Sequence, residues 1–457
     1  MRSLPEGSLA AVRKAPCRRR LVRAGGAALA VVLLAFLLTP MGRYLSRAAW
    51  EEGWILARRE SIADLLDAGA DGTGLAPDSL RAFNGDAPSA QAESARGTGA
   101  DAARSRPLSR AERDKLRLVL EARRFAEARL GLTAGASFTR YSRLRRDTLV
   151  LVLSAARRDT LAPYTWWFPV VGRFPYKGFF DFNEARRTAE RMQRAGYDTY
   201  LRPAAAFSTL GWFNDPLLST TLRLDSLDLV ETVIHELTHG TVFVRNEVAF
   251  NESFASFVGA HGAAAFFRGR GDERAARAVE SAWRDEKLLG AFWGATLAAV
   301  DSAYRAHPGD SAQRVAARDR VFARMRDVLV RDLAPRLSTV PMERLQRLPL
   351  DNASLLARQV YAADPWLLDA IHERTGRSLP STLALVTRLV AAPRAGGGGG
   401  LAGPGGTATR EPAAAPDRAT TDAAPFVRLR RWLETAAATG AGVGGRDSLA
   451  ATPSPPR

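Results

Sequence analysis

A short run in the middle of the chain combines residue types that can bind a metal ion and activate water. His235, Glu236 and His239 form a His-Glu-x-x-His pattern. Residues four apart share one face of an α-helix, so both imidazoles can reach one ion while Glu236 reaches a water molecule beside it. The spacing therefore predicts a zinc (Zn2+) site, with His235 and His239 as metal ligands and Glu236 as the general base of a hydrolytic reaction.

The surroundings of this pattern favour a functional interpretation over a chance match. The flanking residues Val233, Ile234 and Val242 are apolar, which indicates a buried helix rather than a solvated, charged one. The chain holds five histidines in 457 residues, so two of them at ligand spacing around a glutamate are not expected from composition. Buried histidines also need a polar partner, and a metal ion would be one.

A catalytic zinc ion is generally held by three protein ligands, and a glutamate can be the third partner of two histidines. Glu252 follows His239 by thirteen positions, within a run of the form Asn-Glu-x-x-Ala that is seen in glutamate-zincins. Glu247 is the alternative, because it also follows an asparagine, but Phe250 occupies the place of the small residue. We therefore expect Glu252 to be the third metal ligand, on a second helix that packs closely against the first through Ala255.

This arrangement predicts hydrolysis of a peptide or amide bond. The ion would polarise the scissile carbonyl, and Glu236 would take a proton from the attacking water and pass it to the departing nitrogen. A hydrogen-bond donor is also needed for the negative charge that develops on the carbonyl oxygen. Tyr176, His261 and Tyr361 are the candidates for this donor, and each of them could instead be a packing residue.

Longer motifs before the histidines extend the pattern. The chain carries, in this order, Trp166–Gly172, Pro175–Phe180, Ala206–Phe213 and Asp215–Ser219, followed by the two metal-binding runs. Together these motifs resemble the bacterial putative zinc aminopeptidase family, which is glutamate-zincin-like, over roughly residues 43 to 390. The resemblance implies a zincin-like catalytic domain, zinc as the cofactor, the ligands and base named above, and a substrate-side wall formed by Phe207–Phe213.

Two features depart from what this resemblance implies. Members of the family often carry a lipoprotein cysteine at the end of the signal segment, whereas the only cysteine here, Cys17, precedes the apolar run. Well-studied zinc aminopeptidases hold the substrate amine with a Gly-x-Met-Glu-Asn motif, which this chain lacks. The choice between an aminopeptidase and an endopeptidase therefore stays open at the level of sequence.

The N-terminus predicts a membrane segment. Seven basic residues within residues 1–23 precede an uncharged, mostly apolar stretch over residues 24–42, which is typical of a signal anchor or signal peptide. Nineteen residues can just span a bilayer, and the basic flank should stay in the cytoplasm. No small-x-small cleavage site is evident near Thr39, so we expect a single uncleaved span in the inner membrane, with the catalytic domain in the periplasm. The exported part would contain no cysteine and hence no internal disulfide.

The formal net charge of +17 does not indicate nucleic-acid binding. Only four residues are lysine, the arginines are spread through the expected helices, and no basic run is interleaved with aromatic residues. The expected partners are therefore a peptide substrate and the membrane, with no nucleic acid.

The remaining pattern predicts an α+β fold that is mainly α-helical. Ser109 and Glu112 form a capping box for a helix to about Leu130. From residue 272 to about residue 390 the pattern is again helical, which indicates a helical lobe beside the metal helices. A small mixed sheet is expected to precede these helices, from strands near residues 148–153, 167–171, 199–201 and 206–209.

The same segments define the expected domain organisation. The chain would begin with a basic cytoplasmic region and the membrane segment, and a flexible insertion would interrupt the catalytic part. The tail is rich in Gly, Ala and Pro and is expected to be disordered apart from one short helix. The expected ranges are 1–23 for the basic region, 24–42 for the membrane segment, 43–70 for the first helix of the catalytic domain, 71–107 for the insertion, 108–390 for the zinc peptidase domain, and 391–457 for the tail, with its helix over 426–439.

The expected function is that of a membrane-anchored, envelope-facing zinc metallopeptidase, with aminopeptidase as the leading activity. An exported zinc endopeptidase or amidase would use the same residues. A non-catalytic, zinc-stabilised envelope protein is the alternative from another class, but a structural zinc site usually has a closed shell of four ligands and needs no base beside its histidines. The presence of Glu236 therefore favours an enzyme.

Overall fold

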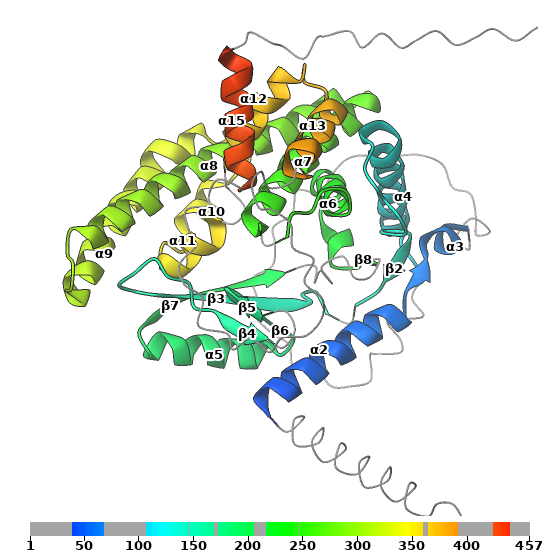
Figure 1. The fold of residues 1–457 in the computed structure, drawn as a ribbon. Coiled ribbons are helices and arrows are strands. Elements are labelled where there is room, and N and C mark those ends of the chain that lie inside the picture. The colour runs from blue at the N-terminus through cyan, green and yellow to red at the C-terminus, as the bar shows by residue number, and fades with distance from the viewer. Residues whose placement is uncertain are drawn as a thin grey trace, which may run out of the picture. The chain divides into compact units, whose positions relative to one another are not determined.

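The computed structural model describes residues 39–67, 107–144, 146–168, 172–204, 216–245, 247–359, 364–391 and 424–438 (Figure 1). Its contacts divide the chain into two units, Met1–Arg58 and Arg59–Arg457, and each unit is described by itself. In the first unit the described residues form helix α2 (Pro40–Ala57). Thr39 caps this helix, because its side-chain oxygen accepts a hydrogen bond from the Gly42 amide at 2.9 Å.

The membrane span expected over residues 24–42 lies almost wholly outside the described residues. Within the part of the chain that is described, no helix has both the length and the apolar character needed to cross a bilayer.

The expectation of one continuous helix over residues 43–70 is wrong. α2 ends at Ala57, and a shorter helix, α3 (Ile62–Asp67), follows in the second unit. Between them Glu60–Ser61 forms strand β1, which pairs antiparallel with β2 (Arg140–Ser142). The backbone hydrogen bonds of this pairing replace those that a continuous helix would have made.

The metal-binding pattern lies on helices that pack into one hydrophobic core. α4 (Arg110–Phe125) begins with the expected capping box, in which the Ser109 amide donates to Glu112 at 2.7 Å and the Glu112 amide donates to Ser109 at 3.1 Å. It continues as a π-helix to Leu130. α6 (Ser226–His239) and α7 (Val248–Gly269) pack against it and against each other.

The strands of the described residues form three small sheets rather than the single mixed sheet that was expected. The largest is antiparallel, with β3 (Val150–Arg157) at its centre between β6 (Tyr176–Phe179) and β7 (Tyr197–Ala204). β4 (Trp166–Phe168) and β5 (Gly172–Phe174) form a hairpin. β2 pairs with β1 and, in parallel, with β8 (Leu217–Leu218). The strand expected at residues 206–209 lies outside the described residues.

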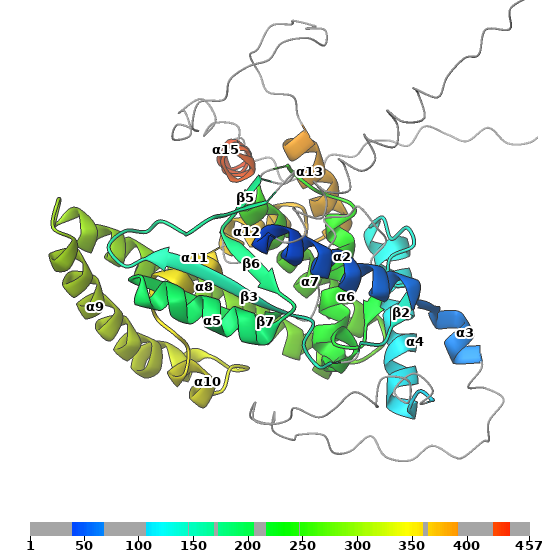
Figure 2. The same ribbon diagram turned by 90° about the horizontal axis from the view of Figure 1, so that it is seen from below.

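Helices cover the two faces of the large sheet. α5 (Phe182–Arg194) buries Ala185 and Ala189 against Leu153 and Phe179 on one face. α11 (Asn352–Gln359) packs on the strands β3 and β7 from the other side, and Figure 1 shows α5 below the sheet and α11 above it. Figure 2 shows α5 lying along β3 and β7 when the protein is seen from below.

The described residues between 272 and 391 are mainly helical, as expected, so the fold is mainly helical α+β. Buried aromatic residues such as Phe292, Trp293 and Phe322 pack the first two helices of this region, α8 and α9, against each other. The Asp198 carboxylate joins this lobe to the large sheet, because Arg318 donates to it in a buried ion pair. The further helices of the second unit are α8 (Glu273–Arg305), α9 (Ser311–Asp327), a π-helix (Val328–Leu333), a 3-10 helix (Ala334–Arg336), α10 (Met342–Gln346), α12 (Pro365–Arg374), α13 (Leu379–Ala391) and α15 (Pro425–Ala438), which lies where the tail helix was expected.

Candidate metal centre

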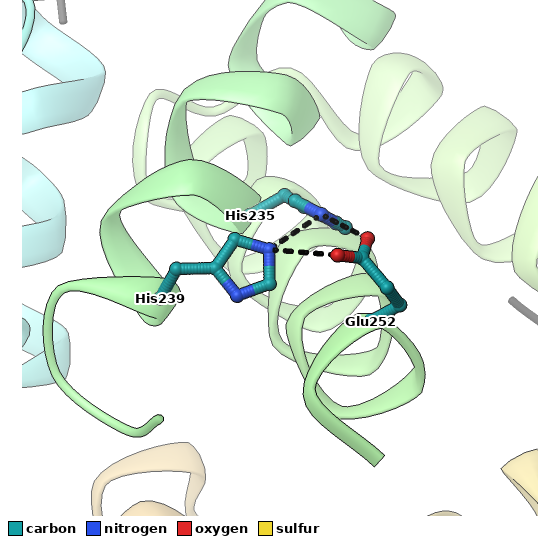
Figure 3. A group of neighbouring side chains, drawn as sticks. All are labelled: His235, His239 and Glu252. Carbon is teal, nitrogen blue, oxygen red and sulfur yellow. Dashed lines mark hydrogen bonds and ion pairs between the residues drawn. The ribbon is translucent and has the colours of Figure 1, made fainter. Parts of the chain in front are cut away.

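Three side chains from α6 and α7 converge on one point (Figure 3). The Nε2 atoms of His235 and His239 are 3.2 Å apart. Glu252 places its Oε2 atom 3.5 Å from Nε2 of His235 and its Oε1 atom 3.7 Å from Nε2 of His239. One donor atom from each residue lies within 4.8 Å of the others, and this is the one such group found among the described residues. Two imidazole nitrogens and a carboxylate oxygen are donors that suit zinc, so the three residues could hold a metal ion.

The sequence of α6 explains how the two histidines come to face one way. They are one helical turn apart, while Val233, Ile234 and Leu237 are buried in the core on the other side of the helix. The two imidazole rings meet edge to face, with centroids 4.9 Å apart and planes at 81°. Both side chains remain partly exposed, which leaves the point of convergence open to a ligand.

Two glycines of α7 let this helix approach α6 closely. A Cβ atom on Gly259 would lie 3.1 Å from the backbone oxygen of Glu231 and 3.3 Å from the Cβ of His235. A Cβ atom on Gly262 would lie 2.9 Å from Cγ2 of Ile234. Only Ala255 was predicted from the sequence to allow this close packing, and both glycines were missed. Both glycines lie inside an apolar helix, where glycine lowers stability. Such a position could have indicated that a neighbouring helix approaches closely there.

We expect Gly262→Ala to lower the free energy of unfolding by about 1 to 3 kcal/mol, because the added methyl group must push Ile234 aside in a packed core. The same shift should also weaken metal binding, since it moves α7 away from the histidines. Gly294→Ala on α8 is the matched control, because no atom lies within 4 Å of the added Cβ. Denaturant unfolding would contradict the account if the two variants were equally stable.

The loop between the two helices is fixed by the asparagine that precedes Glu252. Asn251 is 4% exposed, and its side chain accepts a hydrogen bond from the Val244 amide and donates one to the Val244 carbonyl, both at 2.8 Å. Thr241 holds the start of the loop by accepting a hydrogen bond from the Thr133 amide at 2.8 Å. The asparagine of the motif therefore positions the loop and the first turn of α7, a role that the sequence analysis did not assign.

The structure distinguishes between the two glutamates considered as third ligand. Glu252 lies in the second turn of α7 and faces both histidines. Glu247 occupies the N-cap position of α7, in the connecting loop, and is not part of the group.

The charges around His235 and His239 shift the pKa values of these two histidines in opposite directions. Burial would lower the pKa of His235, but the hydrogen bond with Glu252 and the charges of Glu236, Glu252 and Glu231 raise this pKa above its usual range. Burial and the neighbouring His235 lower the pKa of His239 to about 4. Without a metal ion, His235 therefore holds a proton more readily than His239 does. A metal ion bound by these residues would compete with that proton.

The carboxylate of Glu252 is held in its charged form. Burial would raise the pKa of Glu252, but the hydrogen bond from His235 and the charges of His239, His235 and Arg202 outweigh burial and lower this pKa below its usual range. The charge of Arg202 reaches Glu252 from strand β7, so the large sheet also contributes to the electrostatics of this group.

Glu231 lies one turn before His235, and its pKa is unusually high. Burial and the charge of Asp228 raise the pKa of Glu231 to about 7, against an opposing effect of His235. In the unfolded chain the pKa of Glu231 is 4.5. Below this pH Glu231 is protonated in both the folded and the unfolded state and does not affect the free energy of unfolding. Above pH 7 it is ionised in both states, and its buried charge lowers the free energy of unfolding.

We therefore expect Glu231→Gln to stabilise the metal-free protein by about 2 to 3 kcal/mol at pH 8 and to have little effect at pH 4. The gain should appear between pH 4.5 and about 7, the two pKa values of the residue. Glu190→Gln, on an exposed position of α5, is the control. A pH-independent effect of Glu231→Gln in denaturant unfolding would contradict this assignment.

The other residues singled out from the sequence are placed as follows. Glu236 is half-buried on α6 beside the group, and its charge acts on His235. Tyr176 begins strand β6, is 38% exposed and packs edge to face on Phe174. His261 lies nine residues after Glu252, on the opposite face of α7, where its Nε2 atom is 3.1 Å from Asp369. Tyr361 and the run Phe207–Phe213 lie outside the described residues.

Comparison with known proteins supports the family suggested by the motifs. No curated protein and no solved structure matches the chain. The model of the family described as "Putative aminopeptidase" matches residues 98–396, well over half of the 457 residues. The chain that carries the His235, His239 and Glu252 group therefore belongs to the putative aminopeptidase family.

Proposed function

We propose that this protein is a zinc-dependent metallopeptidase with a zincin-like catalytic domain, and that aminopeptidase is its leading activity. The observation that carries the proposal is the convergence of His235, His239 and Glu252 in one group, with Glu236 next to it on α6. Membership of the aminopeptidase family supports a peptidase in general terms. In this proposal His235, His239 and Glu252 hold the zinc ion and Glu236 is the base.

The metal ligands and Glu236 have different roles in the proposed reaction. A bound zinc ion would supply a Lewis acid that polarises the scissile carbonyl and makes water more acidic. Glu236 takes the proton of the attacking water and delivers it to the departing nitrogen, so that the carboxylate is ionised again after each turnover. Glu236 can act in this way because it is adjacent to a ligand without being one of the three converging residues. Tyr176 and Tyr361 remain the proposed donors to the developing oxyanion.

The alternatives predict different substrates for the same residues. An aminopeptidase should hydrolyse aminoacyl amides and peptides with a free amino terminus, and N-acetylation should abolish cleavage. An endopeptidase or amidase should cleave the blocked peptides. A non-catalytic zinc-stabilised protein should cleave neither. Assays of the wild-type protein on matched free and blocked peptides, before and after removal of metal with a chelator and return of zinc, test the proposal. Hydrolysis that survives complete metal removal would contradict it.

We also propose that residues 24–42 anchor the protein in the inner membrane with its catalytic part in the periplasm. The basic N-terminal flank and the nineteen-residue apolar stretch support this orientation. The protein should stay with the membrane fraction after a carbonate wash and be digested by protease added to spheroplasts. Protection from that protease would contradict the orientation.

A further inference from the structure

Helix α15 packs on the core that carries the metal helices, although it lies outside the segment that the family model matches. The match ends at residue 396, and residues 392–424 separate α13 from α15. Leu429 of α15 is fully buried, in the same hydrophobic cluster as the apolar residues of α6 and α7. α15 contacts α12 and α13, and Figure 1 shows it beside α12. The C-terminal part of the chain therefore adds a separate helix to the core of the second unit.

One face of α15 makes this contact. The residues that are buried or pack on the core recur at intervals of three and four, which places them on one side of the helix. They are Phe426, Leu429, Trp432, Leu433 and Ala436. Residues away from this face, such as Glu434 and Ala437, are exposed. This pattern is that of an amphipathic helix docked on a surface through one apolar stripe.

The first turn of α15 contacts the first turn of α7. The rings of Phe426 and Phe250 meet edge to face, with centroids 5.6 Å apart and planes at 75°. Phe250 is fully buried and also stacks on Phe254, one turn further along α7, at 5.6 Å. Glu252 lies between these two phenylalanines in the sequence. The ring of Phe426 therefore helps to fix the turn of α7 from which Glu252 reaches the two histidines.

α15 also contacts both ends of α12. Arg430 forms an ion pair with Asp364, the N-cap residue of α12. Asp364 has a left-handed backbone conformation, with a φ of 54°, and its side chain makes no capping hydrogen bond. At the other end of α12, Nη1 of Arg374 donates to the carbonyl of Ala436 at 3.3 Å. The carboxylate of Asp364 thus contacts α15 instead of capping its own helix, as an N-cap aspartate commonly does.

α12 is connected in turn to α7. Asp369, in the middle of α12, lies 3.1 Å from Nε2 of His261 on α7 and accepts a hydrogen bond from Nε1 of Trp283 on α8 at 3.0 Å. The ring of Phe257 on α7 meets the ring of His372 on α12 edge to face, with centroids 5.6 Å apart. α15 therefore supports α7 in two ways, directly through its own first turn and indirectly through α12.

The position of α15 depends on a small number of contacts. Its ion pair is partly exposed, since the side chains of Arg430 and Asp364 are 56% and 28% exposed, and such pairs contribute little to stability. A helix of fourteen residues is only marginally stable by itself in water, so burial of the apolar face has to hold α15 in place. α13 ends at Ala391 and α15 begins at Pro425, so α15 can separate from the surface without disrupting the preceding helix.

We propose that the surface formed by α7, α12 and α13 is a docking site for the C-terminal helix α15, and that docking of α15 holds Glu252 in position at the metal centre. The inference rests on the proposed metal site and adds a means of regulation to it. Zinc binds tightly when α15 is docked and more weakly when α15 is released. The surface is apolar and carries Asp364 at its edge, so it fits an amphipathic helix with an arginine next to its central leucine.

The test uses full-length proteins in which one substitution releases α15. Leu429→Asp places a charge in the buried cluster and should undock the helix, whereas Ala437→Asp, at an exposed position of the same helix, should not. Hydrogen exchange read by mass spectrometry measures docking, and competition with a chromophoric chelator measures zinc affinity. Leu429→Asp should lose protection over residues 425–438. Its zinc affinity should fall about 10- to 100-fold, as it does when residues that support ligands are removed.

A synthetic peptide of residues 424–438 tests the docking surface separately. Added to the Leu429→Asp protein, the peptide should bind the surface and restore zinc affinity, and the same peptide with Leu429→Asp should do neither. If the Leu429→Asp protein does not fold, Phe426→Ala replaces it, with the same direction of change. The wild-type protein gives a further measurement, since the amides of α15 should exchange faster than those of α7 and α12 if α15 opens by itself.

The outcomes distinguish the docking surface from the metal site on which the inference rests. An undocked α15 with unchanged zinc affinity, or a bound peptide that restores no affinity, would overturn the proposed effect on Glu252. Equal exchange of α15 and α7 in the wild-type protein would make α15 a permanent part of the core and overturn its release. Peptide binding by the Leu429→Asp protein, together with a wild-type protein that binds no zinc, would retain the docking surface and remove the metal site.

Discussion

Replacing Glu236 with glutamine is expected to reduce peptide hydrolysis by at least about 1,000-fold while leaving the metal bound, since general-base catalysis alone contributes up to about 10,000-fold. Glutamine has nearly the same size and shape but cannot accept the proton of the attacking water. The ligands His235, His239 and Glu252 are unchanged, so the affinity for zinc should be close to that of the wild-type protein.

Two measurements on the same protein check this expectation: metal content by elemental analysis, and kcat on the best peptide substrate. Glu247→Gln is the matched control, because it removes a charge from the neighbouring loop outside the metal centre. Wild-type turnover in Glu236→Gln would refute the proposed mechanism. Loss of zinc together with activity would instead show that Glu236 is needed to hold the metal.

The second large effect is expected from Glu252. Glu252→Ala should weaken zinc binding by at least about 100-fold, because changes to residues that only support ligands already cost about 10- to 100-fold. Glu247→Ala should change the affinity little, since Glu247 lies at the N-cap of α7 and outside the group. The variant also leaves His235 without the carboxylate that stabilises its proton.

Zinc affinities for this comparison are measured by competition with a chromophoric chelator at pH 7.5. Unfolding curves of the metal-free variants control for general damage to the helix pair. If Glu247→Ala lost more affinity than Glu252→Ala, the third ligand would have to come from the connecting loop, and the packing of α6 on α7 would need another explanation.

Several features of the fold could be predicted because they depend on local spacing. The capping box of Ser109 and Glu112 needs only three residues of separation, and the helix over residues 425–438 needs only its own apolar stripe. The shared face of His235 and His239 follows from the helical period. The convergence of Glu252 on the two histidines was expected from the motif, and the structure brings the three side chains together.

Other features depend on contacts between distant segments and could not be predicted. The strand at Glu60–Ser61 exists because it pairs with residues 140–142, so the apolar stripe of the preceding helix did not reveal it. The three small sheets replace one because pairing partners are chosen across the whole chain. Asn251 forms hydrogen bonds with Val244, and the glycines of α7 lie against α6. Neither contact can be read from the motif alone.

The central claim is that His235, His239 and Glu252 hold one zinc ion, and the most direct test is the zinc content of the purified protein beside that of His239→Ala. Both proteins are supplied with zinc, passed over a desalting column and analysed for metal, with circular dichroism to verify folding. We expect one zinc ion per wild-type chain and none in the folded variant. A folded wild-type protein that retains no zinc, or a His239→Ala protein that retains it fully, would contradict the claim.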